Sequence, residues 1–292
     1  MPNNYTLYRS SFPSSDGSSK ISGYMCMPNR RTPRSVVQIV SGAGKSFADY
    51  EALTEHLTGN GYVVCGHDHL STGESRNEGD TEGYFGKLYG KKILIEDTRR
   101  MTALIRQNIE GLSVVMAGDG FGAVIAETLM AEDGGVADGY VLIDSLEASR
   151  FIKKLRRAAK RRSRFSGEKK RGEYITKMLN RRGKRTEGGK SDNISADLGR
   201  ASLTYRGFYD VLSIVCDLNK MGGTGYGKKD IPLLIVSKVK SLKNPYKNRT
   251  NGTYENYLSN HFTDARMILS EETIFNESVF NSLSEWLNEH SF

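Results

Sequence analysis

The sequence predicts an α/β protein built on a mostly parallel, doubly wound sheet. Short apolar runs alternate with amphipathic stretches along most of the chain, and this alternation is typical of that fold class. After a first hairpin the apolar runs are continuous, which favours strands that are buried on both faces. A glycine-rich corner at residues 118–122 joins one such run to a helical stretch, as expected for a sharp strand–turn–helix connection.

The individual elements follow from these patterns. Six apolar runs are expected to form strands, at residues 21–27, 36–40, 62–66, 113–117, 139–144 and 232–237. Helical periodicity is found at residues 50–58, 93–108, 122–131 and 272–290. The last of these stretches carries one apolar face, made of Phe280, Leu283, Trp286 and Leu287. Because such a face must be buried, we expect this helix to pack on the sheet.

Length and composition fit one large domain with an insertion. The chain has 292 residues, of which 37% are hydrophobic. No apolar run approaches the roughly 20 residues of a membrane-spanning helix, and the first residues form no basic-then-apolar leader. The three cysteines are far apart in sequence, so we expect no disulfide framework. These features predict a cytoplasmic protein that is not transmembrane, and no motif calls for a metal or another cofactor.

The charge of the chain is concentrated in one segment. The net charge is +8, but residues 150–185 contain 17 Lys and Arg against two acids. That segment therefore carries +15, and the rest of the chain carries −7. It interrupts the strand–helix alternation, so we predict a basic cap at residues 147–210 and a core formed by residues 1–146 and 211–292.

The basic cap allows more than one interpretation. Its cationic candidates are Lys153, Lys154, Arg156, Arg157, Lys160, Arg161 and Arg162. Phe151, Ile152 and Leu155 leave a thin apolar stripe beside them, which suits an anionic lipid surface or an acidic partner. The alternative is a solvated lid helix without a binding role. Nucleic acid is disfavoured as a partner because aromatic side chains for base stacking are sparse.

Several segments, in order and at matching spacing, resemble one family of enzymes. They are residues 37–53, 61–75, 118–122, 205–212 and 231–237. Together they are similar to α/β-hydrolases of the monoacylglycerol lipase, lysophospholipase and serine aminopeptidase-like group. The resemblance implies a central, mostly parallel sheet of about eight strands flanked by helices. It also implies a lid inserted after the sixth strand, over a lipid or acyl pocket.

The catalytic positions implied by this resemblance hold the wrong residues. The nucleophile position is Gly120, which has no side chain. The acid position falls on Ser241. The resemblance places the histidine in a turn near the C-terminus, at residues 265–267, where its position falls on Arg266, or on Met267 if the alignment slips by one residue. Acyl transfer needs a hydroxyl nucleophile, an imidazole base and a carboxylate that act as a unit. We therefore expect no catalytic residues and a pseudoenzyme rather than an enzyme.

The remaining function would be binding. The oxyanion region is represented by Ser41, Ala43 and Phe121. The expected pocket for an apolar or acyl small molecule consists of Ser41, Gly42, Ala43, Asp119, Gly120 and Phe121. The alternative is an active hydrolase of lipid or small esters with a relocated nucleophile, for which Asp119 and Ser41 are the candidates. A third hypothesis is binding of an anionic surface or nucleic acid through the cap alone.

Two other motifs have a structural explanation. His67, Asp68 and His69 could suggest a metal or acid–base cluster, but successive residues of a strand point to opposite faces. Residues 42–46 resemble the end of a phosphate-binding loop, but Ile39 stands where that motif requires glycine. We therefore expect residues 67–69 to be architectural and residues 42–46 to be the altered oxyanion-hole loop.

Overall fold

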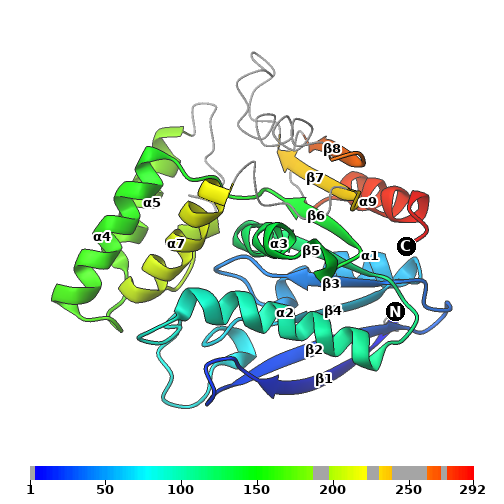
Figure 1. Ribbon diagram of the computed structural model, residues 1–292, viewed down its shortest axis with the longest axis horizontal. Helices are drawn as coiled ribbons and strands as arrows, with labels where there is room; N and C mark the ends of the chain where they lie inside the picture. The colour runs from blue at the N-terminus through cyan, green and yellow to red at the C-terminus, as the bar shows by residue number, and fades with distance from the viewer. Residues whose placement is uncertain (1–3, 187–196, 222–229, 239–261, 271–274) are drawn as a thin grey trace.

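A single eight-stranded sheet forms the centre of the molecule. The computed structural model describes residues 4–186, 197–221, 230–238, 262–270 and 275–292. The strands are β1 (Tyr5–Pro13), β2 (Lys20–Pro28), β3 (Val36–Val40), β4 (Val63–His67), β5 (Val114–Asp119), β6 (Gly139–Ile143), β7 (Leu233–Lys238) and β8 (Ala265–Ser270). Their order in the sheet is β1-β2-β4-β3-β5-β6-β7-β8 (Figure 1). β2 is antiparallel to both of its neighbours, and the other pairs are parallel.

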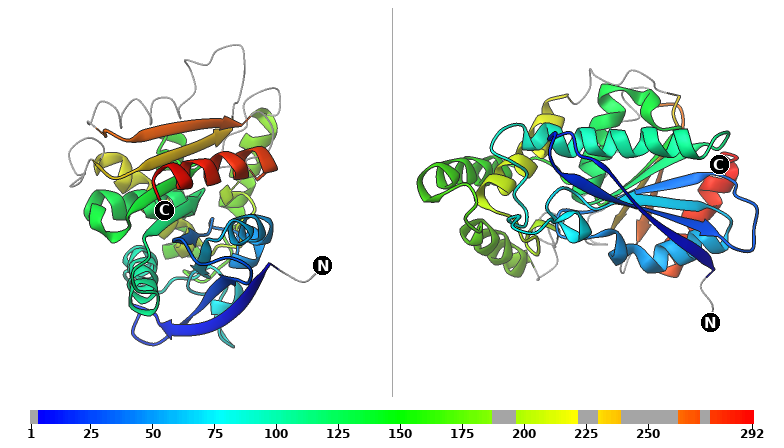
Figure 2. Two further views of the ribbon diagram at one scale, coloured as in Figure 1. Left: turned by 90° about the vertical axis from the view of Figure 1, so that its right-hand side faces the viewer. Right: turned by 90° about the horizontal axis from the view of Figure 1, so that it is seen from below.

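Helices cover both faces of this sheet. The helices are α1 (Glu51–Gly59), α2 (Gly90–Asn108), α3 (Phe121–Glu132), α4 (Arg150–Ser166), α5 (Glu173–Thr186), α7 (Tyr205–Met221) and α9 (Glu277–Glu289). One apolar cluster joins α2, α3 and α7 to one face, and a second joins α1 and α9 to the other. Figure 2 shows the sheet between these two layers. Central strands such as β3 and β5 are buried along their whole length, and their sequences are mostly apolar because helices cover both faces.

The predicted fold class is confirmed, with two strands, β1 and β8, in addition to the six predicted runs. All six expected strands are present, and β1 completes the hairpin with β2. β8 was not expected, because residues 265–267 were interpreted as a turn. It pairs in parallel with β7, from Leu233 opposite Ala265 to Lys238 opposite Ser270. Its residues are only partly buried, since it lies at the edge of the sheet, and this exposure weakens the apolar signal.

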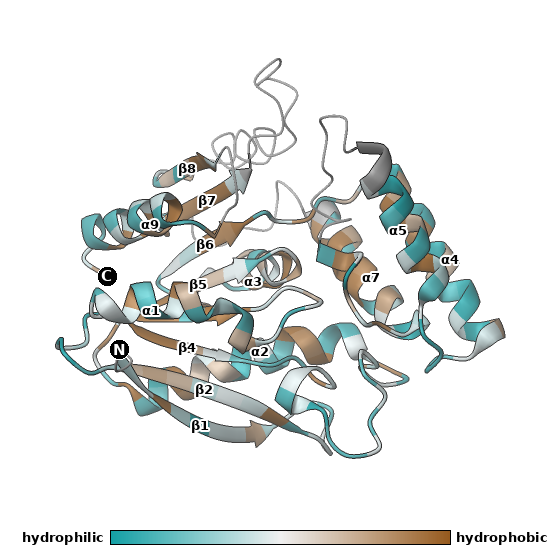
Figure 3. Cartoon of the chain, turned by 180° about the vertical axis from the view of Figure 1, so that it is seen from behind, coloured by the Kyte–Doolittle hydropathy of each residue, from teal (hydrophilic) through white to brown (hydrophobic). Residues whose placement is uncertain are grey.

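The cap consists of α4, α5 and the first part of α7. α7 is one continuous helix that contacts both α4 and α3, so the expected boundary at residues 210/211 falls inside it. The apolar stripe of α4 is not available to lipid: Ile152, Leu155 and Ala159 are buried. These side chains form part of the main apolar cluster together with residues of α7. Figure 3 shows the hydrophilic faces of α4 and α5 on the outside of the cap.

No helix among the described residues is long and apolar enough to cross a bilayer. The three cysteines, Cys26, Cys65 and Cys216, are buried free thiols. Burial raises the pKa of each of these thiols. They therefore behave as small core residues rather than as nucleophiles.

Candidate functional site: the elbow between β5 and α3

The predicted strand–turn–helix corner is present. β5 ends at Asp119, α3 begins at Phe121, and Gly120 between them has φ +55° and ψ −110°. The Gly120 N–H donates to the carbonyl of Ile143 on β6 at 2.8 Å, which fixes the corner at the carboxyl end of the sheet. A positive φ is accessible to glycine without a Cβ clash. The corner thus keeps the backbone of a nucleophile elbow without a nucleophile.

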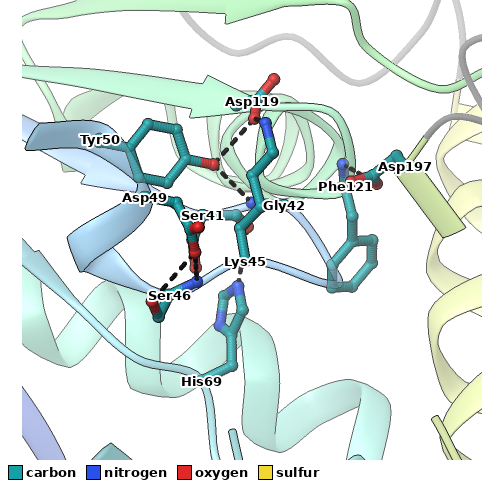
Figure 4. Close-up of polar contacts among 10 residues, drawn as sticks. All are labelled: Ser41, Gly42, Lys45, Ser46, Asp49, Tyr50, His69, Asp119, Phe121 and Asp197. Carbon is teal, nitrogen blue, oxygen red and sulfur yellow. Dashed lines mark hydrogen bonds and ion pairs between the residues drawn. The ribbon is translucent and has the colours of Figure 1, made fainter. Parts of the chain in front are cut away.

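A carboxylate from the cap fills the space beside this glycine. Asp197 Oδ2 accepts a hydrogen bond from the Phe121 N–H at 3.0 Å. A Cβ added to Gly120 would lie 2.8 Å from Asp197 Cγ. Figure 4 shows Asp197 at the start of α3. Sequence reasoning missed Asp197, because it lies in the cap and no local motif marks it.

Burial makes the carboxyl group of Asp197 a weaker acid than an ordinary aspartate. The residue as a whole is partly exposed, but its carboxyl group is buried. This burial, together with the nearby charge of Asp119, raises the pKa of Asp197 from its ordinary value of 3.8 to about 7. The hydrogen bond from Phe121 and the charge of Lys45 act in the opposite direction. The carboxyl group therefore exchanges its proton near neutral pH.

Asp119 is held by a second polar cluster. It forms an ion pair with Lys45 and accepts a hydrogen bond from Tyr50 Oη at 2.8 Å. Tyr50 Oη in turn accepts the Gly42 N–H at 3.0 Å (Figure 4). Burial and the Asp119 charge raise the pKa of Tyr50 well above its usual range, so its phenol stays protonated. Asp119 thus links Lys45 and Tyr50 in one polar cluster beside the corner.

Ser41 lies in the same region, but no base contacts its hydroxyl. His69 Nε2 makes a hydrogen bond with the carbonyl oxygen of Ser41 at 3.0 Å. The Ser41 hydroxyl is buried and has no hydrogen-bond partner in the part of the chain that the structure describes. Burial lowers the pKa of His69, so its ring is neutral near pH 7. Among the described residues, Ser41, one of the two candidates for a relocated nucleophile, therefore lacks the activating contact that such chemistry needs.

The His67–His69 segment is part of the architecture. Asp68 accepts hydrogen bonds from Tyr24 Oη and from the Phe47 and Glu74 N–H groups, each at 2.8 Å. His67 is buried and packs edge-on against His69, with ring centroids 5.3 Å apart. Burial lowers the pKa of His67 well below its usual range. These contacts connect strands and loops and leave no open face for a substrate.

The expected position of the catalytic histidine needs a correction. Arg266 and Met267 do not lie in a turn but inside β8, and Arg266 forms an ion pair with Glu289 of α9 at 2.7 Å. Arg266 pairs with Leu234 of β7. Leu234 lies two residues before Val236, the last residue of β7 that pairs with β6. A histidine substituted at this position would therefore face α9 rather than Gly120.

Histidine is also missing from the sequence after β8. Residues 271–274 read Glu-Glu-Thr-Ile, and the next histidine is His290 in the last helical turn. His290 makes a hydrogen bond with Asp264, the residue before β8. Asp264 therefore lies at the amino end of β8, whereas Gly120 follows the carboxyl end of β5. Ser241, the residue expected at the acid position, lies outside the described residues.

The sheet order and the corner after β5 define an α/β-hydrolase. The profile of the family described as serine aminopeptidase, S33, matches residues 31–220. The chain belongs to this family.

Individual relatives point to lipases and esterases. Human monoglyceride lipase is 30% identical over 115 residues, which is 39% of this chain and 36% of the human protein. A monoglyceride lipase homologue of Monkeypox virus is 26% identical over 114 residues, 39% of each chain. The match thus spans less than two fifths of these relatives' length.

Solved structures extend the likeness to the whole chain. A thermostable carboxyl esterase from Bacillus coagulans, in complex with glycerol, has a TM-score of 0.80 at 18% identity, covering 98% of this chain and 99% of the esterase. A soluble variant of monoglyceride lipase from Saccharomyces cerevisiae has a TM-score of 0.66 at 19% identity, covering 100% and 97%. At these identities the likeness shows the fold.

Proposed function

We propose that this chain is a non-catalytic member of its lipase- and esterase-like family, which retains the fold for binding. The observation that carries the proposal is Gly120, which has the elbow backbone without a side chain. Two further features support it. The Phe121 amide, which would face a developing oxyanion, already binds Asp197, and the sequence has no histidine between β8 and His290.

The ligand expected for a protein of this lipase- and esterase-like family is an apolar or acyl small molecule. The six residues expected to line the pocket lie together and are buried: Ser41, Gly42, Ala43, Asp119, Gly120 and Phe121. Ala43 and Phe121 belong to the main apolar cluster, which also includes Leu198 and Ala201 next to Asp197. A ligand must displace the Asp197 side chain to reach Gly120, because that side chain now occupies the space.

Catalytic silence is the direct test. The purified protein is expected not to react with a fluorophosphonate probe and not to cleave p-nitrophenyl esters faster than a heat-denatured sample. The physical reason is the missing hydroxyl at Gly120 together with the missing base. Ser41→Ala serves as the matched control, because it removes the buried hydroxyl that is a candidate for a relocated nucleophile. Stoichiometric labelling of wild type would contradict the proposal, and its loss in Ser41→Ala would assign the nucleophile to Ser41.

The cap surface supports a second candidate function, docking on an anionic lipid surface. Five of the seven candidate cations are exposed: Lys153, Lys154, Arg157, Lys160 and Arg161. None of these five makes an ion pair with another described residue. At the end of α4 the Phe165 side chain is 84% exposed. An exposed aromatic side chain among cations suits the interface of an anionic bilayer.

Two of the candidate cations have structural roles instead. Arg156 lies 3.9 Å from an Asp217 carboxylate oxygen, and Arg162 stacks on the ring of Tyr174, with 3.9 Å between the guanidinium carbon and the ring centroid. Both side chains are only partly exposed. The docking surface is therefore defined as Lys153, Lys154, Arg157, Lys160, Arg161 and Phe165.

Vesicle binding tests this second function. Wild type is expected to bind vesicles with anionic lipid, to ignore neutral ones and to lose binding as salt rises. Replacing Lys153, Lys154, Arg157 and Arg161 with Gln should remove most of the binding, since each cation near the surface contributes about 1 kcal/mol. The control replaces Lys20, Arg30, Arg31 and Lys87, four exposed cations of the core, and should bind like wild type. Equal loss in both variants would show a net-charge effect without a docking surface.

A further inference from the structure

We propose that a small cavity in the cap binds the phosphate group of a phosphorylated molecule. The cavity has a volume of about 270 Å³ and lies between the first turns of α5 and the segment that leads into α7. That volume corresponds to about nine waters at roughly 30 Å³ each, which is room for a small ligand. The cavity shares no lining residue with the pocket around Gly120, so the inference goes beyond the proposed function. It is lined by residues 171–173, 176, 177 and 200–203.

The first argument is the charge of the lining. Three cations, Arg171, Lys177 and Arg200, line the cavity against a single acid, Glu173, so the net charge is +2. All four residues are exposed, and a ligand can therefore reach them from water. Neither Lys177 nor Arg200 forms an ion pair with another described residue. A phosphate monoester carries a charge of about −1.5 to −2 at pH 7 and matches this lining better than a singly charged carboxylate does.

The second argument is the arrangement of Arg171. Its Nη1 donates to the Ser202 carbonyl oxygen and its Nη2 to the Ser202 hydroxyl, each at 3.1 Å. A longer contact of 3.5 Å joins Nη1 to Glu82. A guanidinium has more donors than these contacts use, and the Nε–H and one Nη2–H remain without a partner among the described residues. Two adjacent donors of this kind bind a phosphate through parallel hydrogen bonds, and the contacts with Ser202 already hold the guanidinium in place.

The third argument is that the two walls of the cavity are fixed before a ligand arrives. The Gly172 N–H donates to the Leu203 carbonyl oxygen at 2.9 Å, which joins the start of α5 to the opposite wall. A Cβ on Gly83 would lie 2.3 Å from the Ser202 carbonyl oxygen, so residues 200–203 also pack closely against the loop before α2. A preformed site loses less conformational freedom on binding than one that must first be ordered.

Calorimetric titration with inorganic diphosphate tests the site, because this probe presents phosphate groups with more than one negative charge. Wild type is expected to bind it with one-to-one stoichiometry. Lys177→Gln combined with Arg200→Gln should weaken binding about tenfold or more, because both charged donors are lost. Glu173→Gln should strengthen binding several-fold, because it removes the acid that repels the probe.

The matched control replaces Arg164 and Lys170 with Gln, two exposed cations of the cap that do not line the cavity. It has the same net charge as the variant without Lys177 and Arg200, and it should bind diphosphate like wild type. Equal weakening in the two double variants would show an effect of net charge alone and would overturn the inference. Undetectable binding by wild type at millimolar diphosphate would also overturn it.

A second measurement locates the bound anion on the molecule. In a nuclear magnetic resonance titration of wild type, diphosphate should shift the amide resonances of Thr176 and Ser202. The amides of Lys153 and Arg157, in the docking surface on α4, should stay in place. The reverse pattern would contradict the inference, because the anion would then lie on α4 and not in the cavity.

Vesicles that contain phosphatidic acid identify the source of the phosphate group, because that headgroup is itself a phosphate monoester. If the variant without Lys177 and Arg200 binds these vesicles more weakly than the control variant does, the cavity takes a lipid headgroup. If the two variants bind the vesicles equally while only the first loses diphosphate, the cavity takes a soluble phosphorylated molecule.

Discussion

Gly120→Ser is expected to lower the free energy of unfolding by about 2–4 kcal/mol. One part is backbone strain, since φ is +55° at this position and such strain costs about 1–3 kcal/mol for a residue with a Cβ. The other part is steric, because the new Cβ would lie 2.8 Å from Asp197 Cγ and push that carboxylate off the Phe121 amide. Urea denaturation of the two proteins measures the difference, and the variant should remain inactive for want of a base.

A double-mutant cycle separates the two parts. In the Asp197→Ala background, Gly120→Ser should cost about 1–2 kcal/mol less than in wild type, because the carboxylate is gone and only the backbone strain remains. Gly17→Ser is the matched control for strain alone. Gly17 has φ +82°, and a Cβ there would meet nothing within 4 Å. Additive effects in the cycle would mean that Asp197 does not fill the space beside Gly120.

The second large effect is a pH dependence of stability carried by Asp197. Its pKa is 3.8 in an unfolded chain and about 7 in the folded protein, so the folded state binds more protons between these values. The stabilising contribution is thus complete below about pH 4 and is lost as the pH rises through 7. We expect wild type to lose about 2–4 kcal/mol over this interval relative to Asp197→Asn, whose amide does not titrate.

Comparing wild type with Asp197→Asn separates the contribution of Asp197 to the pH dependence of stability from that of all other titrating groups. Burial also raises the pKa of Asp210 to about 6, so wild type contains a second acid with the same sign of effect. Asp210 is bonded to Arg206 and is present in both proteins, so its contribution cancels in the difference. Unfolding by urea at pH 4.5, 6, 7.5 and 8.5 measures that difference. Parallel curves for the two proteins would place Asp197 in water rather than beside Phe121.

The elbow was predictable because all of its determinants are local. The apolar run of β5, the glycines of residues 118–122 and the small residues of α3 are consecutive in sequence. The glycines are required by close backbone contacts: a Cβ on Gly122 would lie 1.9 Å from the Val40 carbonyl oxygen. The absence of a hydroxyl at Gly120 is likewise a property of one position. Pattern and composition therefore determined the backbone of the corner and the glycine at its centre.

Prediction from the sequence was wrong where the deciding contacts join residues that are far apart along the chain. Arg266 looked like a turn residue because β8 is a partly exposed edge strand, and an edge strand need not read as a continuous apolar run. The stripe of Ile152 and Leu155 looked available to lipid because nothing in α4 itself shows that α7 covers it. In both cases the deciding partner lies more than 30 residues away, beyond the reach of local periodicity.

The sequence by itself determined the α/β-hydrolase fold, the glycine at the centre of the corner after β5 and the concentration of positive charge at residues 150–185. These depend on the order of residues along the chain, which sets strand and helix periodicity and local charge. Only the tertiary structure decided that Asp197 contacts Phe121, 76 residues away, and that Lys45 neutralises Asp119. The reason is physical: a buried carboxylate is stable only where folding brings a donor to it, and the Phe121 donor here is a main-chain amide that carries no sequence signature.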